Sequence, residues 1–89
     1  MLSFEDAKDK ALEEINKNYK IQGDQIIIRD EYTLTNDYGW IFSYQSKLAL
    51  EGSFKHRLVG NLPLFVSKEN GSLYYIPHGT TIEDIIKNL

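Results

Sequence analysis

The sequence predicts an α+β domain: an N-terminal helix, a four-stranded antiparallel sheet built from two hairpins, and a short C-terminal helix, packed as two layers. Three observations predict it. A helical apolar stripe runs through residues 4–19, two β-branched and aromatic runs flank a turn at residues 36–39, and an Asn-Gly pair separates two later apolar runs. Because 89 residues suffice for one hydrophobic core and leave no room for a second module, we expect a single domain over residues 1–89.

The first helix is predicted by its cap and its apolar spacing. Ser3 and Asp6 have the spacing of a capping box, so the helix should begin at Phe4 and fade near Asn18. Gly23 then opens a loop. One apolar stripe follows from spacings of three and four residues: Phe4, Ala7, Ala11, Ile15 and Tyr19. This is the pattern of an amphipathic helix lying over a core.

The first hairpin is rich in β-branched and aromatic residues. Residues 25–34 and 40–45 favour strands, and the turn cluster between them favours antiparallel pairing. Trp40, Phe42 and Tyr44 alternate along the second strand and so share one face, which the first helix can cover. We therefore expect these three side chains in the core. Since tryptophan and tyrosine also anchor many protein interfaces, a contact surface on this hairpin is the alternative.

A second hairpin is predicted at Asn70-Gly71, between strands at residues 64–68 and 73–76. An Asn-Gly pair favours a type I′ turn, whose two central residues both need positive φ. The antiparallel sheet would therefore contain four strands.

A short helix should close the domain. Gly79 ends the preceding strand, and Thr80 with Glu83 repeats the capping-box spacing. The apolar stripe of this helix would be Ile82, Ile85, Ile86 and Leu89.

The composition is that of a folded domain outside the membrane. Hydrophobic residues make up 42% and charged residues 26%, which argues against disorder and against a membrane span. The absence of cysteine excludes disulfides and thiolate metal sites and fits a reducing compartment. The N-terminus is acidic and capped where a secretory signal is basic and then apolar, so we expect the protein in the cytoplasm.

The net charge of −3 is unevenly distributed. Residues 1–37 carry nine acids and five bases, whereas residues 38–68 carry one acid, Glu51, and four bases. Nucleic-acid affinity comes from clustered lysine and arginine, and the acidic first part would repel phosphates. We therefore expect neither a nucleic acid nor a membrane as the partner.

No catalytic pattern stands out. His56 and His78 lack the short spacings of a metal site, and the glycines fit neither the dinucleotide nor the P-loop motif. Asp30 and Glu31 are adjacent, so in a strand they would point to opposite faces. We expect no cofactor, no metal and no enzymatic activity. The competing enzyme hypothesis needs a concave pocket with converging polar groups.

A series of short runs extends over most of the chain in a specific order: Asp37-Tyr38-Gly39-Trp40, Phe42, Tyr44-Gln45-Ser46-Lys47, Gly60-Asn61-Leu62-Pro63, Val66, Lys68, Asn70-Gly71 and Gly79-Thr80. In this order and spacing the runs resemble the immunity protein 35 (YrhB-like) family of bacterial polymorphic toxin systems. The chain departs from the family pattern at Leu62, where a small residue is expected, and at Ile85 and Ile86, where tyrosine is common.

The resemblance implies a small cytosolic protein, encoded beside a toxin gene, that binds this cognate toxin and blocks its active site or substrate surface. Some relatives stand alone without an adjacent toxin, which implies the alternative of a chaperone-like or stress-related binding protein. Either way the partner is a protein, and the oligomeric state is a monomer or a weak homodimer.

The partner-binding residues are expected on the sheet rim and on the long connection that follows. Residues 46–61 have no clear period, and Ser53 can cap a helical turn through Phe54 and Leu58. Long irregular connections often carry binding residues, so residues 47–57 have the best functional claim there. The candidate set is Asp37, Tyr38, Gln45, Lys47, Glu51, Phe54 and Lys55.

A second set of residues is assigned to structure. Gly60 would end a helical turn, and Asn61 would bond nearby backbone and set the direction of the third strand before Pro63. The complete structural set is Gly39, Trp40, Phe42, Tyr44, Gly60, Asn61, Pro63, Asn70 and Gly71.

Overall fold

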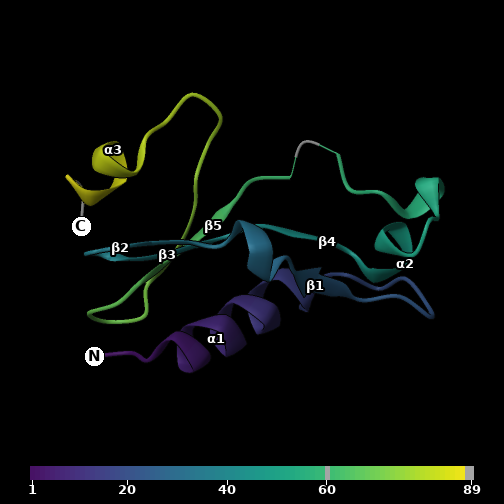
Figure 1. Ribbon diagram of the computed structural model, residues 1–89, viewed down its shortest axis with the longest axis horizontal. Helices are drawn as coiled ribbons and strands as arrows, with labels where there is room; N and C mark the ends of the chain where they lie inside the picture. The colour runs from purple at the N-terminus through teal and green to yellow at the C-terminus, as the bar shows by residue number, and fades with distance from the viewer. Residues whose placement is uncertain (60, 88–89) are drawn as a thin grey trace.

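The computed structural model describes residues 1–59 and 61–87, and over these residues the chain has the predicted α+β architecture (Figure 1). A helix leads into antiparallel strands and a short helix follows them. The elements in chain order are α1 (Phe4–Asn16), β1 (Ile26–Ile28), the 3-10 turn η1 (Asp30–Tyr32), β2 (Leu34–Asn36), β3 (Gly39–Phe42), β4 (Tyr44–Ser46), α2 (Lys47–Leu50), the 3-10 turn η2 (Phe54–His56), β5 (Leu64–Ser67), β6 (Leu73–Tyr75) and α3 (Ile82–Ile86).

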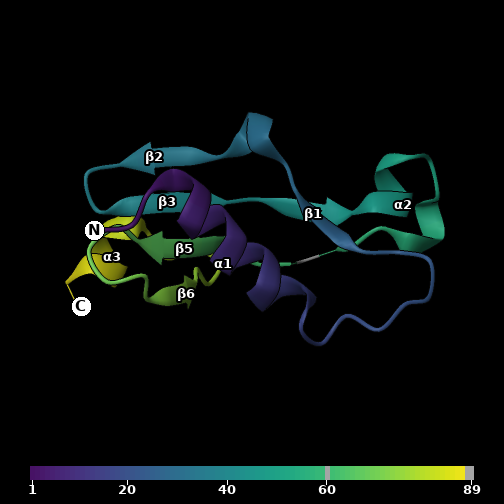
Figure 2. The ribbon, with the colours of Figure 1, turned by 90° about the horizontal axis from the view of Figure 1, so that it is seen from below.

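The strands form two antiparallel sheets. The predicted four-stranded sheet is present in the order β2-β3-β5-β6, and it consists of the two predicted hairpins joined along β3 and β5. An additional two-stranded sheet pairs β1 with β4. It extends the strand pair β2–β3 away from the β2–β3 turn, so the molecule is elongated, with extents of 38 × 27 × 23 Å (Figures 1 and 2).

The prediction of one continuous strand over residues 25–34 is wrong, because η1 interrupts it. Five residues separate the partners Ile28 and Leu34, whereas two separate their counterparts Tyr44 and Ile41, so three residues of the first strand have no counterpart. They form η1, where a run of charged side chains replaces the isoleucines that α1 covers. The second predicted strand also divides, at Ser43, into β3 and β4.

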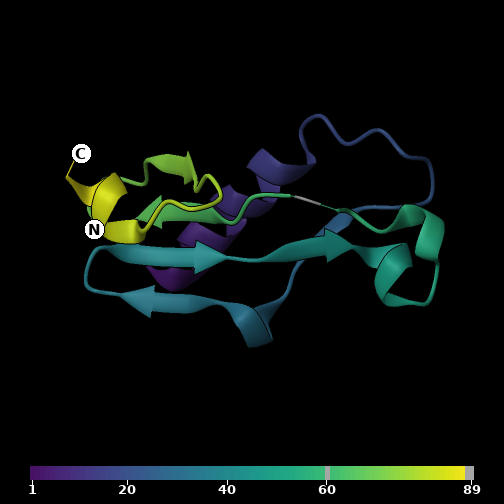
Figure 3. The ribbon, with the colours of Figure 1, turned by 90° about the horizontal axis from the view of Figure 1, so that it is seen from above.

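The core lies between α1 and one face of the sheets (Figure 2). Trp40, Phe42 and Tyr44 are buried, which confirms their predicted core position. The Phe4 ring of α1 packs against the Trp40 ring at a centroid distance of 6.1 Å and against the Phe42 ring at 5.9 Å. The predicted stripe of α1 therefore covers the aromatic face of β3. The opposite face of the four-stranded sheet carries α3 (Figure 3).

Two side chains set the ends of α1. The Oγ of Ser3 accepts a hydrogen bond from the Asp6 amide, which confirms the predicted start. The helix ends at Asn16, before the predicted Asn18, because the Asn16 amide pairs with β1: its Nδ2 donates to the Ile26 carbonyl at 2.9 Å and its Oδ1 accepts from the Ile26 amide at 2.8 Å.

The Asn70-Gly71 hairpin is confirmed, but its predicted type I′ turn is wrong. Ser67 and Ser72 are hydrogen bonded, so four residues form the connection. Gly71 has a φ of 73°, whereas Asn70 has no positive φ. Asn70 instead accepts a hydrogen bond from the Ser72 amide through its side-chain oxygen, which stabilises the longer turn.

The last helix begins one residue later than predicted. Thr81, not Thr80, caps α3, and it forms a reciprocal capping box with Asp84. Thr80 belongs to the preceding turn, where its amide donates to the Pro77 carbonyl. The predicted apolar residues of α3 are half-buried, and Leu89 lies outside the described residues.

Candidate protein-binding surfaces

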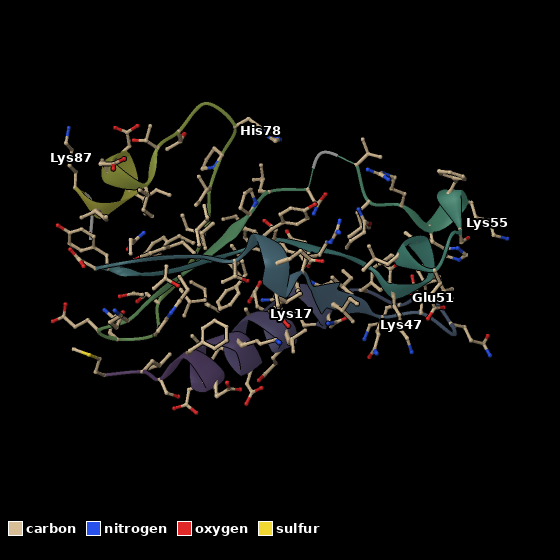
Figure 4. All side chains as sticks on the ribbon, viewed as in Figure 1. Lys17, Lys47, Glu51, Lys55, His78 and Lys87 are labelled. Atoms are coloured by element: carbon tan, nitrogen blue, oxygen red, sulfur yellow. The ribbon has the colours of Figure 1, made fainter. Side chains whose placement is uncertain are left out.

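The predicted partner-binding residues lie at two opposite ends of the long axis (Figures 1 and 3). Asp37 and Tyr38 form the β2–β3 turn at one end. At the other end, residues 47–59 contain α2 and η2, and we call this segment the α2–η2 lobe. Four of the predicted residues belong to it: Lys47, Glu51, Phe54 and Lys55. Figure 4 shows three of these, Lys47, Glu51 and Lys55, together at this end.

The β2–β3 turn is fixed by hydrogen bonds and by a close approach of two strands. The Oδ1 of Asn36 accepts from the amides of Tyr38 and Gly39. A Cβ atom on Gly39 would overlap the carbonyl oxygen of Val66 in β5, so the position requires glycine. Tyr38 is exposed and lines a depression of about 250 Å³ together with neighbouring residues of the β5–β6 turn.

The α2–η2 lobe exposes apolar side chains. The exposed fractions are 86% for Phe54, 86% for Val59 and 42% for Leu50. Phe54 was in the predicted set, whereas Leu50 and Val59 were not. The sequence gives one indication for these two residues: they are isolated apolar residues in a segment that lacks the apolar spacing of a helix or a strand. The part of the chain predicted to be irregular therefore presents an apolar surface.

The first half of the lobe is a capped helical turn that the sequence reading missed. The Oγ of Ser46 accepts from the Ala49 amide and caps α2. The carboxylate of Asp24 accepts from the Leu48 amide at 3.0 Å. The Ser53 amide donates to the Leu48 carbonyl, and the Ser53 hydroxyl bonds Nδ1 of His56 at 2.7 Å across η2. Ser53 therefore stabilises the predicted turn at Phe54, through His56 instead of through a backbone cap.

The far end of the lobe is tied to the sheet by Gln45. Its Oε1 accepts from the Leu58 amide at 2.6 Å, and its Nε2 donates to the Leu58 carbonyl at 3.2 Å. The side-chain amide of Gln45 thus forms the same two hydrogen bonds with Leu58 as a paired residue of a neighbouring strand would form. Leu58 was predicted to belong to a helical turn, but it lies beyond η2 because Gln45 holds it in this pairing. Gln45, predicted to contact a partner, is half-buried and positions the lobe.

The chain beyond the lobe is held in the same way. Nδ2 of Asn61 donates to the Tyr44 carbonyl, and the Tyr44 hydroxyl donates to the Leu62 carbonyl at 2.5 Å. The prediction that Asn61 bonds nearby backbone is wrong, because its side-chain amide bonds the backbone of β4. Pro63 accepts from the Ile76 amide and continues the β5–β6 pairing. Gly60 lies outside the described residues.

Asp24 connects the segment that follows α1, β4 and the lobe. Its carboxylate also accepts from the Tyr19 hydroxyl at 2.6 Å, the Ser46 hydroxyl at 2.5 Å and the Gln25 amide at 2.8 Å. Desolvation by itself would raise the pKa of Asp24, but the hydrogen bonds from Ser46, Tyr19 and the two backbone amides outweigh it and hold the pKa well below its ordinary value. The hydrogen bond to Asp24 in turn raises the pKa of Tyr19.

Three ion pairs form in the described chain, and none of them involves the lobe. Lys8 contacts Asp30 at 2.8 Å and Arg29 contacts Glu31 at 3.6 Å, so the two acids predicted to lie on opposite faces of a strand instead lie in η1 with separate cationic partners. The exposed charged residues of the lobe show no ion pair within the described chain: Lys47, Glu51, Lys55 and Arg57.

The two histidines do not converge on other ligand groups. His56 is half-buried and bonds Ser53, whereas His78 is exposed and lies far from Lys55, the neighbour of His56 in η2 (Figure 4). In residues 1–59 and 61–87, no three His, Cys, Asp or Glu side chains cluster closely enough to hold a metal ion. Within the same ranges, no helix combines the length and apolarity needed to cross a bilayer.

Comparison with known protein families gives a match over nearly the whole chain. The model of the family described as immunity protein 35 matches residues 5–83, nearly the whole chain. No curated protein and no solved structure matches. The matched region includes both ends of the molecule described above and most of α1.

Proposed function

Because this chain belongs to the immunity protein 35 family, we propose that it binds a cognate bacterial toxin and neutralises it by protein–protein contact. The family match over residues 5–83 is the observation that carries this proposal. We place this activity in the cytoplasm of the producing cell, as part of a polymorphic toxin system. The resemblance deduced from the sequence motifs is thereby confirmed at the level of the family.

Neutralisation by contact needs an exposed surface of defined shape and charge, and no reactive group of the immunity protein itself. The chain offers two such surfaces, the β2–β3 turn with Tyr38 and the α2–η2 lobe with Phe54. Aromatic side chains that bury a large area with little loss of rotamer freedom are common anchors of interfaces. Binding at either surface would block a toxin by covering its active site or substrate surface.

Co-expression tests this proposal. The toxin gene beside the gene of this protein would be induced in a bacterial host with and without the protein, and growth and complex formation would be measured. We expect growth to be restored and the two proteins to purify together. Continued growth arrest without a co-purified complex would refute the proposal.

A second candidate, a chaperone-like or stress-related binding protein, is favoured by apolar exposure outside the two ends. Tyr32 and Leu34 are exposed near and on the edge strand β2. Such scattered apolar groups suit many clients better than one partner. Suppression of aggregation of several unrelated, heat-denatured proteins would support this function, and activity towards the neighbouring toxin alone would refute it.

A further inference from the structure

We propose that the α2–η2 lobe is the surface that contacts the toxin, and that the toxin presents an acidic surface around an apolar pocket that receives Phe54. This inference rests on the proposed function and specifies its partner by chemistry. The predicted partner-binding residues lie at both ends of the molecule, and this inference assigns the contact to the end that holds the lobe.

The apolar side chains of the lobe favour a protein partner. Phe54 and Val59 are each 86% exposed, and Leu50 adds a third apolar contact. An exposed aromatic residue in the same segment as smaller exposed apolar residues is the composition of an interface centre, where a few anchors carry most of the binding free energy. The lobe is therefore suited to a partner that supplies an apolar pocket.

The charges of the lobe favour an acidic partner. Three exposed bases, Lys47, Lys55 and Arg57, accompany one acid, Glu51. The ion pairs of the described chain form elsewhere, on α1 and η1, and leave these three bases without an acidic partner. Unpaired charges around an apolar centre steer association with a surface of the opposite sign.

The lobe is also held rigidly before it binds. Ser53, the residue before Phe54, is tied to the Leu48 carbonyl, and Leu58 is tied to Gln45. Hydrogen bonds thus fix the chain on both sides of η2. A side chain displayed by a fixed turn loses less conformational entropy on binding than one on a free loop.

The β2 edge and its turn lack this combination. Asp30 and Glu31 are neutralised by Lys8 and Arg29, and the Arg29 guanidinium lies 4.6 Å from the centre of the Tyr32 ring. The charges of η1 and one face of the Tyr32 ring are therefore already engaged within the chain. The lobe combines exposed apolar side chains with three bases that form no ion pair in the described chain.

The test compares matched variants at the two ends of the molecule. The affinity of the purified toxin domain encoded by the neighbouring gene would be measured for the wild type, Phe54→Ala and Lys55→Glu, with Tyr38→Ala and Lys87→Glu as the matched aromatic and lysine controls. Tyr38, Phe54, Lys55 and Lys87 are all exposed, so circular dichroism melts should be unchanged.

We expect Phe54→Ala to raise the Kd about 30-fold or more, as for an interface anchor. Lys55→Glu should slow association about tenfold at low salt and weaken its salt dependence, whereas both controls should stay within about twofold. A large loss for Tyr38→Ala with no change for Phe54→Ala would overturn the inference and leave the proposed function standing. A wild type that neither binds nor neutralises the toxin would overturn both.

The unpaired bases of the lobe could also attract nucleic acid, whose phosphates are negatively charged, so binding of nucleic acid should be tested too. A short DNA duplex and a short RNA would be titrated at about 0.15 M salt. Binding of either more tightly than the toxin, abolished by Lys55→Glu, would also overturn the inference. We expect no such binding, because three bases around an apolar centre are too few to neutralise a phosphate backbone.

Discussion

The substitution Trp40→Ala is a strong test of the core described above. Trp40 is only 6% exposed. Its ring packs in a T-shaped arrangement with the Phe4 ring, and the ammonium group of Lys68 lies 5.5 Å from its centroid. Removing a buried tryptophan side chain costs about 3–5 kcal/mol of the free energy of unfolding. A domain of 89 residues has a total of about 4–13 kcal/mol, so the variant should lose a large share of its stability.

The assay is urea denaturation followed by far-ultraviolet circular dichroism, because Trp40 is the only tryptophan and its removal also removes the fluorescence signal. In a thermal melt followed by the same signal, the melting temperature of Trp40→Ala should fall by about 12 °C or more. Trp40→Phe keeps a ring against Phe4 and should lose less, and Phe54→Ala should change the free energy by under about 0.5 kcal/mol. A loss below about 1 kcal/mol for Trp40→Ala would refute the packing of α1 on β3.

Three further predictions follow from the geometry and the pKa shifts. Gly39→Ala should lower the urea midpoint strongly, because its Cβ would overlap the Val66 carbonyl; an unchanged midpoint would contradict this close approach. The lowered pKa of Asp24 means that its stabilising contribution is complete above about pH 3.9, the pKa of an unfolded aspartate, and is lost as the pH falls further; Asp24→Asn should therefore flatten the acid limb of a stability titration, and equal limbs would refute the role of Asp24. Desolvation, helped by Glu14, raises the pKa of Tyr75 to about 12, so its contribution is present below about pH 10 and is lost as the pH rises towards 12; Tyr75→Phe should reduce that alkaline loss, and an identical alkaline loss would count against it.

Much of the fold could be predicted because it is encoded by neighbouring residues. The Ser3 cap and the apolar stripe gave the start and the buried face of α1. Strict alternation placed Trp40 and Phe42 on the core face of β3. The turn at Asn70-Gly71 was located, although the choice between turn types depended on the pairing of the strands that flank it.

The missed features depend on contacts that are distant in sequence. The η1 interruption follows from the offset of two strand registers and is accompanied by the Lys8–Asp30 pair, and no local pattern reveals either. The local pattern places Gln45 on the outer face of a strand. Its hydrogen bonds with Leu58, which is 13 positions away in the sequence, cannot be predicted from that pattern. For the same reason the sequence could nominate Phe54 and Tyr38 together but could not show that the fold places them at opposite ends.

The pairing of Gln45 with Leu58 has a consequence for how relatives can differ. Gln45 holds the end of the α2–η2 lobe through Leu58, and Ser46 holds its beginning through Ala49. These two attachments determine the backbone path of the lobe between them. Exposed side chains of the lobe can therefore be exchanged without altering the hydrophobic core beneath α1. Under the proposal that the α2–η2 lobe contacts the toxin, grafting the corresponding segment of another family member onto this scaffold should transfer that member's binding while the recipient keeps its melting temperature.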